Sequence, residues 1–288
     1  MSQLLSIVVP VRNMTGKLQH LESWITDAIE FNVEVIIVED IDDPSTTIEL
    51  EKLVSRCGSD KIKKVSGKYG SPGGARNAGK ILSKGKWITF WDSDDIGIPK
   101  VVISYLLDNE KNETAQVLVF SFRTHDWIVD SQVIENLVNP DLHTFDQIAK
   151  NPGIWRIVFS TEFLKDLEFP DYKMAEDQVF LARVGLRKPV ISYVSEVGYL
   201  YYRNVPNQLT SSREAITDLK RSTQEMSEIC DASGQNTFNF ELYIRQSITG
   251  MLHGKFIEKP AFFIGIVKFL LHKFTLTKIA VIVRIMRS

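Results

Sequence analysis

The chain is poor in the residues that build disulfide frameworks and zinc sites. Its 288 residues include only two cysteines, Cys57 and Cys230, and neither belongs to a CxxC or Cys/His cluster. The five histidines are scattered, with no spacing typical of a metal centre. This pattern argues against a disulfide-stabilised scaffold and a structural zinc site, and it favours a reducing compartment.

Long hydrophobic runs are also lacking. A spanning helix needs roughly 18 consecutive apolar residues, whereas four basic residues between 268 and 284 divide the apolar C-terminus. The first apolar run has no basic segment before it and is interrupted by Pro10 and Arg12, which is not typical of a secretory signal. We therefore expect no transmembrane span and a cytoplasmic location.

Acidic residues are missing from the last thirty positions. Residues 259–288 contain six basic residues and no acid, whereas the first 258 carry eight more acidic than basic residues. An acidic body argues against a protein that coats nucleic acid. In the tail, lysines are combined with apolar residues at helical spacing, which suits an anionic membrane interface. Packing of the same stripe on the rest of the protein is the alternative.

What is present is a globular composition, with 44% hydrophobic, 10% aromatic and 24% charged residues. In the first hundred residues, β-type runs alternate with stripes of helical periodicity. Strands are expected at 5–9, 33–38, 62–65 and 86–91, and helices at 18–29, 44–57 and 75–84. Such alternation predicts an α/β fold with a mostly parallel sheet flanked by helices. Further elements are expected at 101–107 (helix), 117–122 (strand), 175–186 (helix), 190–194 with 198–203 (a strand pair) and from 212 onward (helices).

In an open parallel sheet, ligands bind beyond the carboxyl ends of the strands. The segments that follow the first four expected strands are residues 10–13, 39–43, 66–74 and 92–95. We therefore expect these segments to lie along one edge of the sheet.

The strongest chemical signal is Asp92-Ser93-Asp94-Asp95, directly after an apolar strand. Three carboxylates in four positions repel one another unless a cation binds there. Hard oxygen ligands suit Mg²⁺ or Mn²⁺, which share their coordination shell with substrate phosphates. An acidic turn that caps the next helix is the alternative.

A glycine-rich loop, Ser71 to Gly79, leads into a helix with Arg76 in its first turn. Free amides at a helix N-terminus together with a guanidinium form an anion site, and a plain turn is the alternative. A triphosphatase P-loop is disfavoured because Ile81 stands where the metal-binding Ser or Thr is required. A second acidic pair, Glu176-Asp177, opens a later expected helix, where capping is the structural alternative.

Taken together, these motifs resemble those of nucleotide-sugar-dependent glycosyltransferases of family 2, which have the GT-A fold. Residues 6–13 look like the family's opening strand, 38–40 like its nucleoside-binding turn and 74–79 like its helix motif. Residues 92–95 look like its DxD metal motif and 176–180 like its ED motif. The resemblance covers roughly residues 4–203. It implies a catalytic domain over 1–210, with a nucleotide-binding half to about residue 98 and an acceptor half from about 99, followed by a helical region over 211–288.

The resemblance also implies roles for particular residues. Donor contacts are expected at Pro10, Val11, Arg12, Asn13, Glu39, Asp40, Arg76, Asp92, Ser93, Asp94 and Arg203. Metal ligands are expected at Asp94 and Asp95, the catalytic base at Asp177, and acceptor contacts at Glu176 and Trp155. Arg12 stands where the family usually has an aromatic residue, and Glu39-Asp40-Ile41-Asp42 replaces the usual Asp-Asp-Gly-Ser turn, which favours Asp40 for the nucleoside.

These roles form one mechanism. A cation held by Asp94 and Asp95 would neutralise the leaving diphosphate, and Asp177 would deprotonate the attacking hydroxyl on the opposite face of the sugar, which inverts the anomeric centre. Nothing marks the protonated acid that glycoside hydrolysis requires. The aromatic residues Trp155, Tyr199, Tyr201 and Tyr202 suit either a sugar-binding groove or core packing.

The sequence therefore predicts an inverting, metal-dependent hexosyltransferase that uses Mn²⁺ or Mg²⁺. The expected partners are a nucleoside-diphosphate sugar, with UDP the commonest in the family, a saccharide or lipid-linked saccharide acceptor for the cell envelope, and the inner face of the plasma membrane. No nucleic-acid partner is expected, and a homo-oligomer is left open. The alternatives are a catalytically silent GT-A module in a glycan-synthesis complex and, more distantly, a nucleotidyltransferase.

Overall fold

The computed structural model describes residues 3–31, 33–58, 60–110, 114–127, 145–206, 215–233 and 236–253, together with 259, 262–265, 267 and 285. The chain divides into two compact units. The first comprises Met1–Leu142, Ile154–Asp171 and Pro189–Pro206, and the second comprises His143–Gly153, Tyr172–Lys188 and Asn207–Ser288. The predicted division of the chain near residue 210 stays a prediction.

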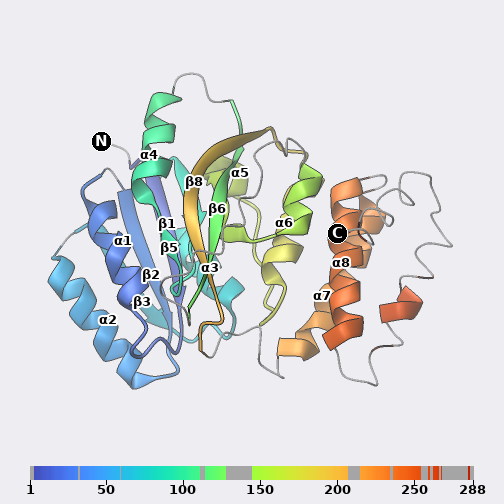
Figure 1. Ribbon diagram of the computed structural model, residues 1–288, viewed down its shortest axis with the longest axis horizontal. Helices are drawn as coiled ribbons and strands as arrows, with labels where there is room; N and C mark the ends of the chain where they lie inside the picture. Colours follow the sequence, from blue (N-terminus) through green and yellow to red (C-terminus); the bar gives the residue numbers. More distant parts are fainter. Residues whose placement is uncertain are drawn as a thin grey trace. The chain divides into compact units, whose positions relative to one another are not determined.

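The first unit is built on a mixed sheet of eight strands (Figure 1). Its strands are β1 (Leu5–Val11), β2 (Val33–Asp40), β3 (Ile62–Gly67), β4 (Trp87–Phe90), β5 (Ile96–Gly97), β6 (Val117–Asp126), β7 (Ile157–Ser160) and β8 (Ile191–Arg203). They lie in the order β3-β2-β1-β4-β7-β6-β8-β5. The first four are mutually parallel, β7 is antiparallel to both of its neighbours, and β5 is antiparallel to β8. The predicted α/β class with a mostly parallel sheet is confirmed.

Helices cover both faces of this sheet. Helices α1 (Gln19–Ile29), α2 (Pro44–Cys57) and α4 (Pro99–Asp108) contribute apolar residues to one core with the inward-facing residues of β1 and β2. Helix α3 (Pro72–Leu82) packs on the opposite face. There, a Cβ atom at Gly79 would lie 2.3 Å from Cγ1 of Val8, so only glycine permits this close approach of helix to sheet.

Capping residues fix where the helices begin. Asp43 accepts hydrogen bonds from the amides of Ser45 and Thr46 and is the N-cap of α2. Helix α3 begins at Pro72, three residues before the predicted start, because Ser71 accepts from the amide of Gly74 and caps it. The glycines that suggested a loop therefore belong to the first turn of the helix.

The predicted pair of strands at 190–194 and 198–203 is wrong. Both runs belong to the single strand β8, which pairs along its length with β6 in parallel. The register shifts twice between Phe120 and Phe122, so the extra residues Ser195, Glu196 and Gly198 are accommodated as an irregularity rather than a turn.

The second unit is helical. Helices α6 (Glu176–Leu186), α7 (Ala215–Ala232) and α8 (Thr237–His253) pack on one another, and the 3₁₀ turn η1 (Phe145–Lys150) packs on α8. Ala175, Leu219 and Phe262 form a small apolar cluster within it. Most of the basic tail lies outside the described residues. In the part of the chain that the structure describes, no helix combines the length and hydropathy needed to cross a bilayer.

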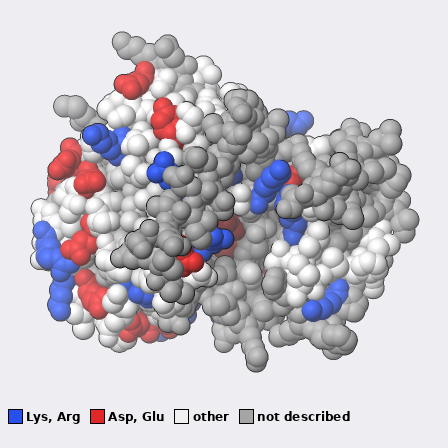
Figure 2. All heavy atoms as spheres, viewed as in Figure 1, with Lys and Arg blue, Asp and Glu red and all other residues white. Residues whose placement is uncertain are grey.

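Charge is mixed over one face of the first unit. On the face that Figure 2 shows, acidic and basic side chains are interspersed rather than gathered into one large patch.

Candidate active site

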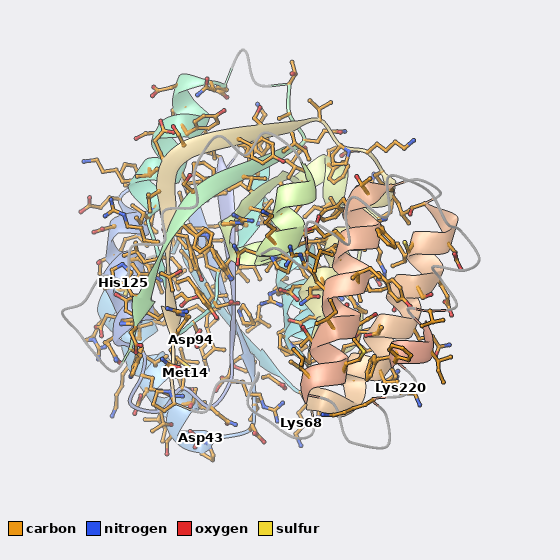
Figure 3. All side chains as sticks on the ribbon, turned by 45° about the vertical axis from the view of Figure 1, so that its right-hand side comes forward. Met14, Asp43, Lys68, Asp94, His125 and Lys220 are labelled. Carbon is orange, nitrogen blue, oxygen red and sulfur yellow. The ribbon has the colours of Figure 1, made fainter. Side chains whose placement is uncertain are left out.

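The segments that follow the first four parallel strands end at one edge of the sheet, as predicted. Because β3, β2, β1 and β4 are adjacent and parallel, their carboxyl ends lie side by side. Figure 3 shows Met14, Asp43 and Asp94, which follow β1, β2 and β4, at this same end. This is the edge at which open α/β sheets bind ligands.

The acidic turn, residues Asp92–Asp95, follows β4 and is anchored by an aromatic residue at its base. Trp91 is buried and packs edge-on against Trp24 of α1 at a ring separation of 4.8 Å. A Cβ atom at Gly97, just beyond the turn, would lie 2.1 Å from the Trp91 ring. The Trp91 ring therefore packs directly against the backbone of Gly97. This contact restrains the backbone on both sides of the acidic turn.

Strand β8 holds the acidic turn through Asp95, which is 1% exposed. The hydroxyl of Tyr199 donates to Oδ2 of Asp95 at 2.9 Å and accepts from the backbone N–H of Asp92 at 3.0 Å. The backbone N–H of Tyr202 donates to Oδ1 of Asp95 at 2.6 Å. One tyrosine hydroxyl thus bridges the first and last residues of the turn.

A cluster of aromatic rings also contacts the acidic turn. Nδ1 of His20 donates to the backbone carbonyl of Asp94 at 2.8 Å. The His20 ring contacts Tyr202 and Trp127, and His125 stacks on Tyr202. Burial and the charge of Arg123 lower the pKa of His125. Sequence spacing offered no signal for His20, because it lies 74 residues from its partner.

The electrostatics of the turn suit a cation. Burial, followed by the negative charges of Asp94 and Asp92, raises the pKa of Asp95 well above its ordinary value, against the hydrogen bonds from Tyr202 and Tyr199. A divalent ion against these oxygens would relieve the repulsion, so the donor set fits Mg²⁺ or Mn²⁺. Among the described residues, no three His, Cys, Asp or Glu side chains are already arranged around a metal position.

Arg76, predicted to contact the donor, is 4% exposed and directed at the acidic turn. Its Nη2 lies 2.8 Å from Oδ1 of Asp92, and its guanidinium lies over the ring of Phe169 at 5.5 Å. The next residue, Asn77, exchanges two hydrogen bonds of 2.9 Å with the backbone of Phe169. Helix α3 therefore orients Asp92 and is also hydrogen-bonded to the segment that follows α5 (Thr161–Leu164).

The residues after β1 and β2 form a second polar group. Arg12 lies 3.4 Å from Oδ2 of Asp40 and 3.1 Å from Oδ2 of Asp42, and Nδ2 of Asn13 donates to the same Asp42 oxygen at 2.9 Å. Asp40 also accepts from the backbone N–H of Tyr69 at 2.7 Å. The arginine that replaces the usual aromatic residue thus makes ion pairs with both aspartates of the neighbouring turn.

Three other predicted donor contacts occupy structural positions. Glu39 is 1% exposed, and its carboxylate is bound by Thr47, Ser66 and Lys64. Burial opposes ionisation, but these hydrogen bonds outweigh it and lower the pKa of Glu39. Pro10 and Val11 are the last residues of β1, and Val11 is buried. Their roles in donor binding remain predictions, as does that of the buried Ser93.

The aromatic residues predicted for acceptor binding are packed together. Trp155, in the 3₁₀ turn η2 (Ile154–Arg156), is 8% exposed and stacks on Tyr199 and Tyr201 at ring separations of 4.7 and 5.2 Å. Phe122 packs edge-on against the same indole. These contacts are what core packing predicts, and the role of Trp155 toward an acceptor stays a prediction. Arg203 is exposed at the end of β8.

The second acidic pair opens α6 in the second unit, as its sequence predicted. Glu176 is buried and Asp177 half-buried, and Oδ1 of Asp177 accepts from the backbone N–H of Gln178 at 2.8 Å. Ala175, just before the pair, has a left-handed backbone with φ of 65°. The chain therefore turns sharply into α6, which places two carboxylates in its first turn.

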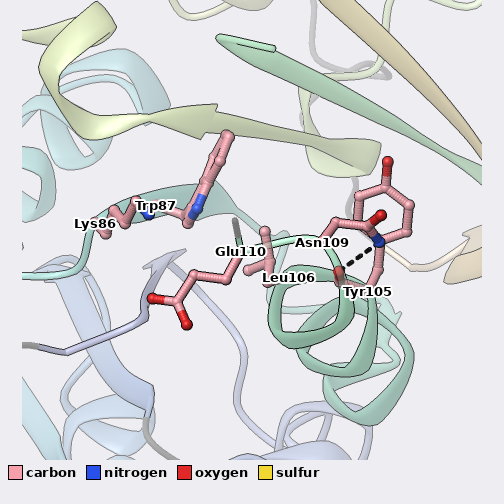
Figure 4. A pocket seen from close by; sticks show the side chains of 6 residues that line it. All are labelled: Lys86, Trp87, Tyr105, Leu106, Asn109 and Glu110. Carbon is pink, nitrogen blue, oxygen red and sulfur yellow. Dashed lines mark hydrogen bonds between the residues drawn. The ribbon is translucent and has the colours of Figure 1, made fainter. Parts of the chain in front are cut away.

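A small pocket elsewhere in the first unit is not part of this site. It is lined by Lys86, Trp87, Tyr105, Leu106, Asn109 and Glu110 (Figure 4). These residues lie at the start of β4 and near the end of α4, whereas the acidic turn follows the end of β4. None of the residues that line this pocket is a predicted site residue.

The mixed sheet flanked by helices, with an acidic turn at its carboxyl edge, is that of the GT-A fold. Comparison with known structures agrees. Staphylococcus aureus TarS 1-349 in complex with UDP-GlcNAc matches with a TM-score of 0.70 at 19% identity, over 94% of this chain and 81% of that one. The mannosyltransferase PcManGT from Pyrobaculum calidifontis, in complex with GDP-Man and Mn²⁺, matches with a TM-score of 0.55 at 12% identity, over 97% and 78%.

The family model of glycosyl transferase family 2 matches residues 6–162, more than half of the chain. The chain belongs to glycosyl transferase family 2. Escherichia coli UDP-Glc:alpha-D-GlcNAc-diphosphoundecaprenol beta-1,3-glucosyltransferase WfgD is 25% identical over 76% of this chain and 83% of its own length. The poly(ribitol-phosphate) beta-glucosyltransferase of Bacillus spizizenii is 28% identical over 68% of this chain and 32% of that protein.

Proposed function

We propose that the protein is an inverting glycosyltransferase that moves a sugar from a nucleoside-diphosphate sugar, with UDP as the nucleotide, to a hydroxyl of a lipid-linked saccharide in cell-envelope glycan synthesis. The observation that carries the proposal is the acidic turn, which strand β8 and Arg76 hold at the carboxyl edge of the sheet. The names of the relatives support the donor and acceptor classes, since one uses UDP-Glc on a diphosphoundecaprenol-linked sugar.

In this proposal, Arg12 and Asp40 recognise the nucleobase. Uracil presents an N–H donor between two carbonyl acceptors, and a carboxylate beside a guanidinium supplies the complementary acceptor and donor. The two groups already lie 3.4 Å apart. Asp92, oriented by Arg76, contacts the ribose or the donor sugar, and Asn13 and Arg203 border the donor.

Asp94 and Asp95 are the residues that would hold Mn²⁺ or Mg²⁺. When bound, such an ion acts as a Lewis acid that stabilises the negative charge on the departing diphosphate. The chain's own contribution is positional, because Tyr199 and Tyr202 fix Asp95 while His20 fixes the backbone of Asp94.

Asp177 is the proposed general base. Its carboxylate takes the proton from the acceptor hydroxyl as the oxygen attacks the anomeric carbon, and Glu176 orients the acceptor. Attack opposite to the departing diphosphate inverts the configuration at that carbon. Trp155 supports the acceptor side through its stack with Tyr199 and Tyr201.

The test is calorimetric titration of the full chain with UDP, GDP and dTDP, each with and without Mn²⁺. We expect metal-dependent binding of UDP that is lost in Asp94→Asn and kept in Asp108→Asn, an exposed aspartate at the end of α4. Absence of nucleotide binding under every condition would contradict the donor site. Nucleotide binding with no sugar transfer to a diphospholipid-linked GlcNAc acceptor would instead favour a silent GT-A module.

We further propose that the basic C-terminal region contacts the inner face of the membrane. Residues 259–288 carry six basic residues and no acid, and two apolar side chains of this region, Phe263 and Ile264, are exposed by 59 and 49%. Apolar side chains beside lysines suit an anionic interface. A lipid-linked acceptor would be reached at the same surface.

Sedimentation with liposomes tests this contact. At low salt, we expect the protein to sediment with phosphatidylglycerol vesicles and to remain in solution with phosphatidylcholine vesicles. Phe263→Ser with Ile264→Ser should reduce sedimentation while nucleotide binding stays intact. Equal behaviour with both lipids would contradict the proposal and favour packing of the tail on the protein.

A further inference from the structure

Helix α7 contacts the segment that leads into the Glu176–Asp177 pair. Oδ2 of Asp218 accepts from the backbone N–H of Lys173 at 2.8 Å, and Oε2 of Glu225 accepts from the hydroxyl of Tyr172 at 2.7 Å. Asp218 and Glu225 are seven residues apart, about two helical turns, so they lie on the same face of α7. That face therefore binds two consecutive residues just before α6.

The same glutamate also binds α6 itself. Arg183, two turns into α6, donates to Oε1 of Glu225 from Nη2 at 2.5 Å and from Nε at 3.1 Å. The guanidinium of Arg221 lies 5.2 Å over the ring of Tyr172. Burial and the hydrogen bond to Glu225 raise the pKa of Tyr172 to about 12.

The backbone at this point needs such support. Ala175 adopts φ of 65°, a left-handed conformation that is unfavourable for a residue other than glycine. It is buried against Leu219 of α7. At the other end of α6, Nδ2 of Asn236 donates to the carbonyl of Gly185 at 3.2 Å. Both ends of α6 are therefore bound by residues that follow it in the sequence.

We propose that α7 is a positioning element of the active site, and that Glu225 is its main positioning residue, because it joins Tyr172 before the acidic pair to Arg183 behind it. The inference rests on the proposed role of Asp177 as the base. It gives the helical region a part in catalysis that is separate from membrane contact. Glu225 itself does not touch the reacting groups.

Hydrogen–deuterium exchange tests whether α7 stabilises the backbone of residues 172–178, independently of any activity. In Glu225→Ala, we expect amide exchange over residues 172–178 to accelerate at least tenfold, with exchange over 92–95 unchanged as an internal reference. The matched control is Glu228→Ala, one turn further on the same helix and exposed. Unchanged exchange over 172–178 in a folded Glu225→Ala protein would overturn the inference.

Kinetics test the consequence for catalysis. With UDP-Glc and a diphospholipid-linked GlcNAc acceptor, we expect Glu225→Ala to lower kcat about tenfold while the Kd of UDP with Mn²⁺ is unchanged. Glu225→Gln, which still accepts from Tyr172, should recover part of the rate. Parallel losses of kcat, nucleotide affinity and Tm would overturn the inference, since they indicate a purely structural role.

The inference can still be tested if Glu225→Ala does not fold or if the wild-type protein transfers no sugar. If Glu225→Ala does not fold, Tyr172→Phe removes only one hydroxyl, and its exchange over 172–178 decides the question by the same criterion. If the wild-type protein binds UDP but transfers no sugar, the proposed function fails. Accelerated exchange in Glu225→Ala would then still support the proposal that α7 holds residues 172–178 in place, and unchanged exchange would still overturn it.

Discussion

The two groups of carboxylates are held in different ways. In the first unit, the acidic turn is bound by β8, a strand more than a hundred residues away in the sequence, and its last carboxylate is 1% exposed. In the second unit, the Glu176–Asp177 pair lies at the start of a helix and is supported through its flanks by α7. The first arrangement immobilises the carboxylates themselves, and the second immobilises the backbone that presents them.

This difference suits the two proposed tasks. Carboxylates that bind a cation and a diphosphate must keep a fixed spacing, which a buried network provides. A general base must exchange its proton at each turnover, which is easier for a half-buried carboxylate such as Asp177. Each arrangement includes a tyrosine whose hydroxyl donates to a carboxylate: Tyr199 donates to Asp95, and Tyr172 donates to Glu225.

The largest expected effect separates the two groups functionally. Asp177→Asn should lower sugar transfer by about 10³-fold, within the range for loss of a general base, while the Kd of UDP with Mn²⁺ stays that of the wild type. Transfer is measured by release of UDP in the presence of acceptor, and nucleotide binding by calorimetry. The control is Asp166→Asn, an exposed aspartate of the first unit. Comparable transfer by Asp177→Asn would remove Asp177 as the base.

The next largest effect concerns the ion pair that orients the acidic turn. Arg76→Ala should lower the free energy of unfolding by about 2 kcal/mol, because it leaves Asp92 beside two other acids without its buried partner, an effect reduced by the partial exposure of Asp92. UDP binding should weaken as well. Chemical denaturation measures the first and calorimetry the second. Arg56→Ala, which removes an exposed pair with Glu22, should change neither by much.

A smaller effect is expected from the tyrosine that bridges the turn. Tyr199→Phe should weaken UDP binding in the presence of Mn²⁺ about fivefold to tenfold, since one hydrogen bond contributes roughly 1–1.5 kcal/mol. Tyr201→Phe is the matched control, because its ring stacks on the same Trp155. Equal affinities of the two variants would show that the hydroxyl of Tyr199 does not support the donor site.

The smallest effect is a slope in stability at alkaline pH. The pKa of Tyr172 is raised to about 12 from 10, so the folded state retains a proton that the unfolded state loses. The stability that this proton contributes is fully present below about pH 10 and is lost as pH rises toward 12. Denaturation midpoints measured across this window should fall less steeply in Tyr172→Phe than in the wild type. An identical slope would contradict the contact with Glu225.

Local sequence determined the elements and the order of the motifs. Asp43 and Gly58 mark the ends of α2, alternating apolar runs predict the first four parallel strands, and these together predict where the acidic turn lies. Each of these features depends on neighbours within a few residues, so periodicity and capping preferences suffice to recognise it. The glycine-rich start of α3 was missed because Ser71 and Pro72 outweigh the flexibility of the glycines that follow.

Only the tertiary structure decided which side chains meet. The sequence offers Tyr199 as one aromatic residue in an alternating strand, and nothing local links it to Asp92 and Asp95, more than a hundred positions away. The pairing of Arg12 with Asp40 and that of Glu225 with Tyr172 are equally invisible from spacing. Sequence therefore determined the chemistry available at each position, because residue type and local periodicity are local properties. The tertiary structure decided how that chemistry is held, because burial and long-range hydrogen bonds depend on the packing of distant segments.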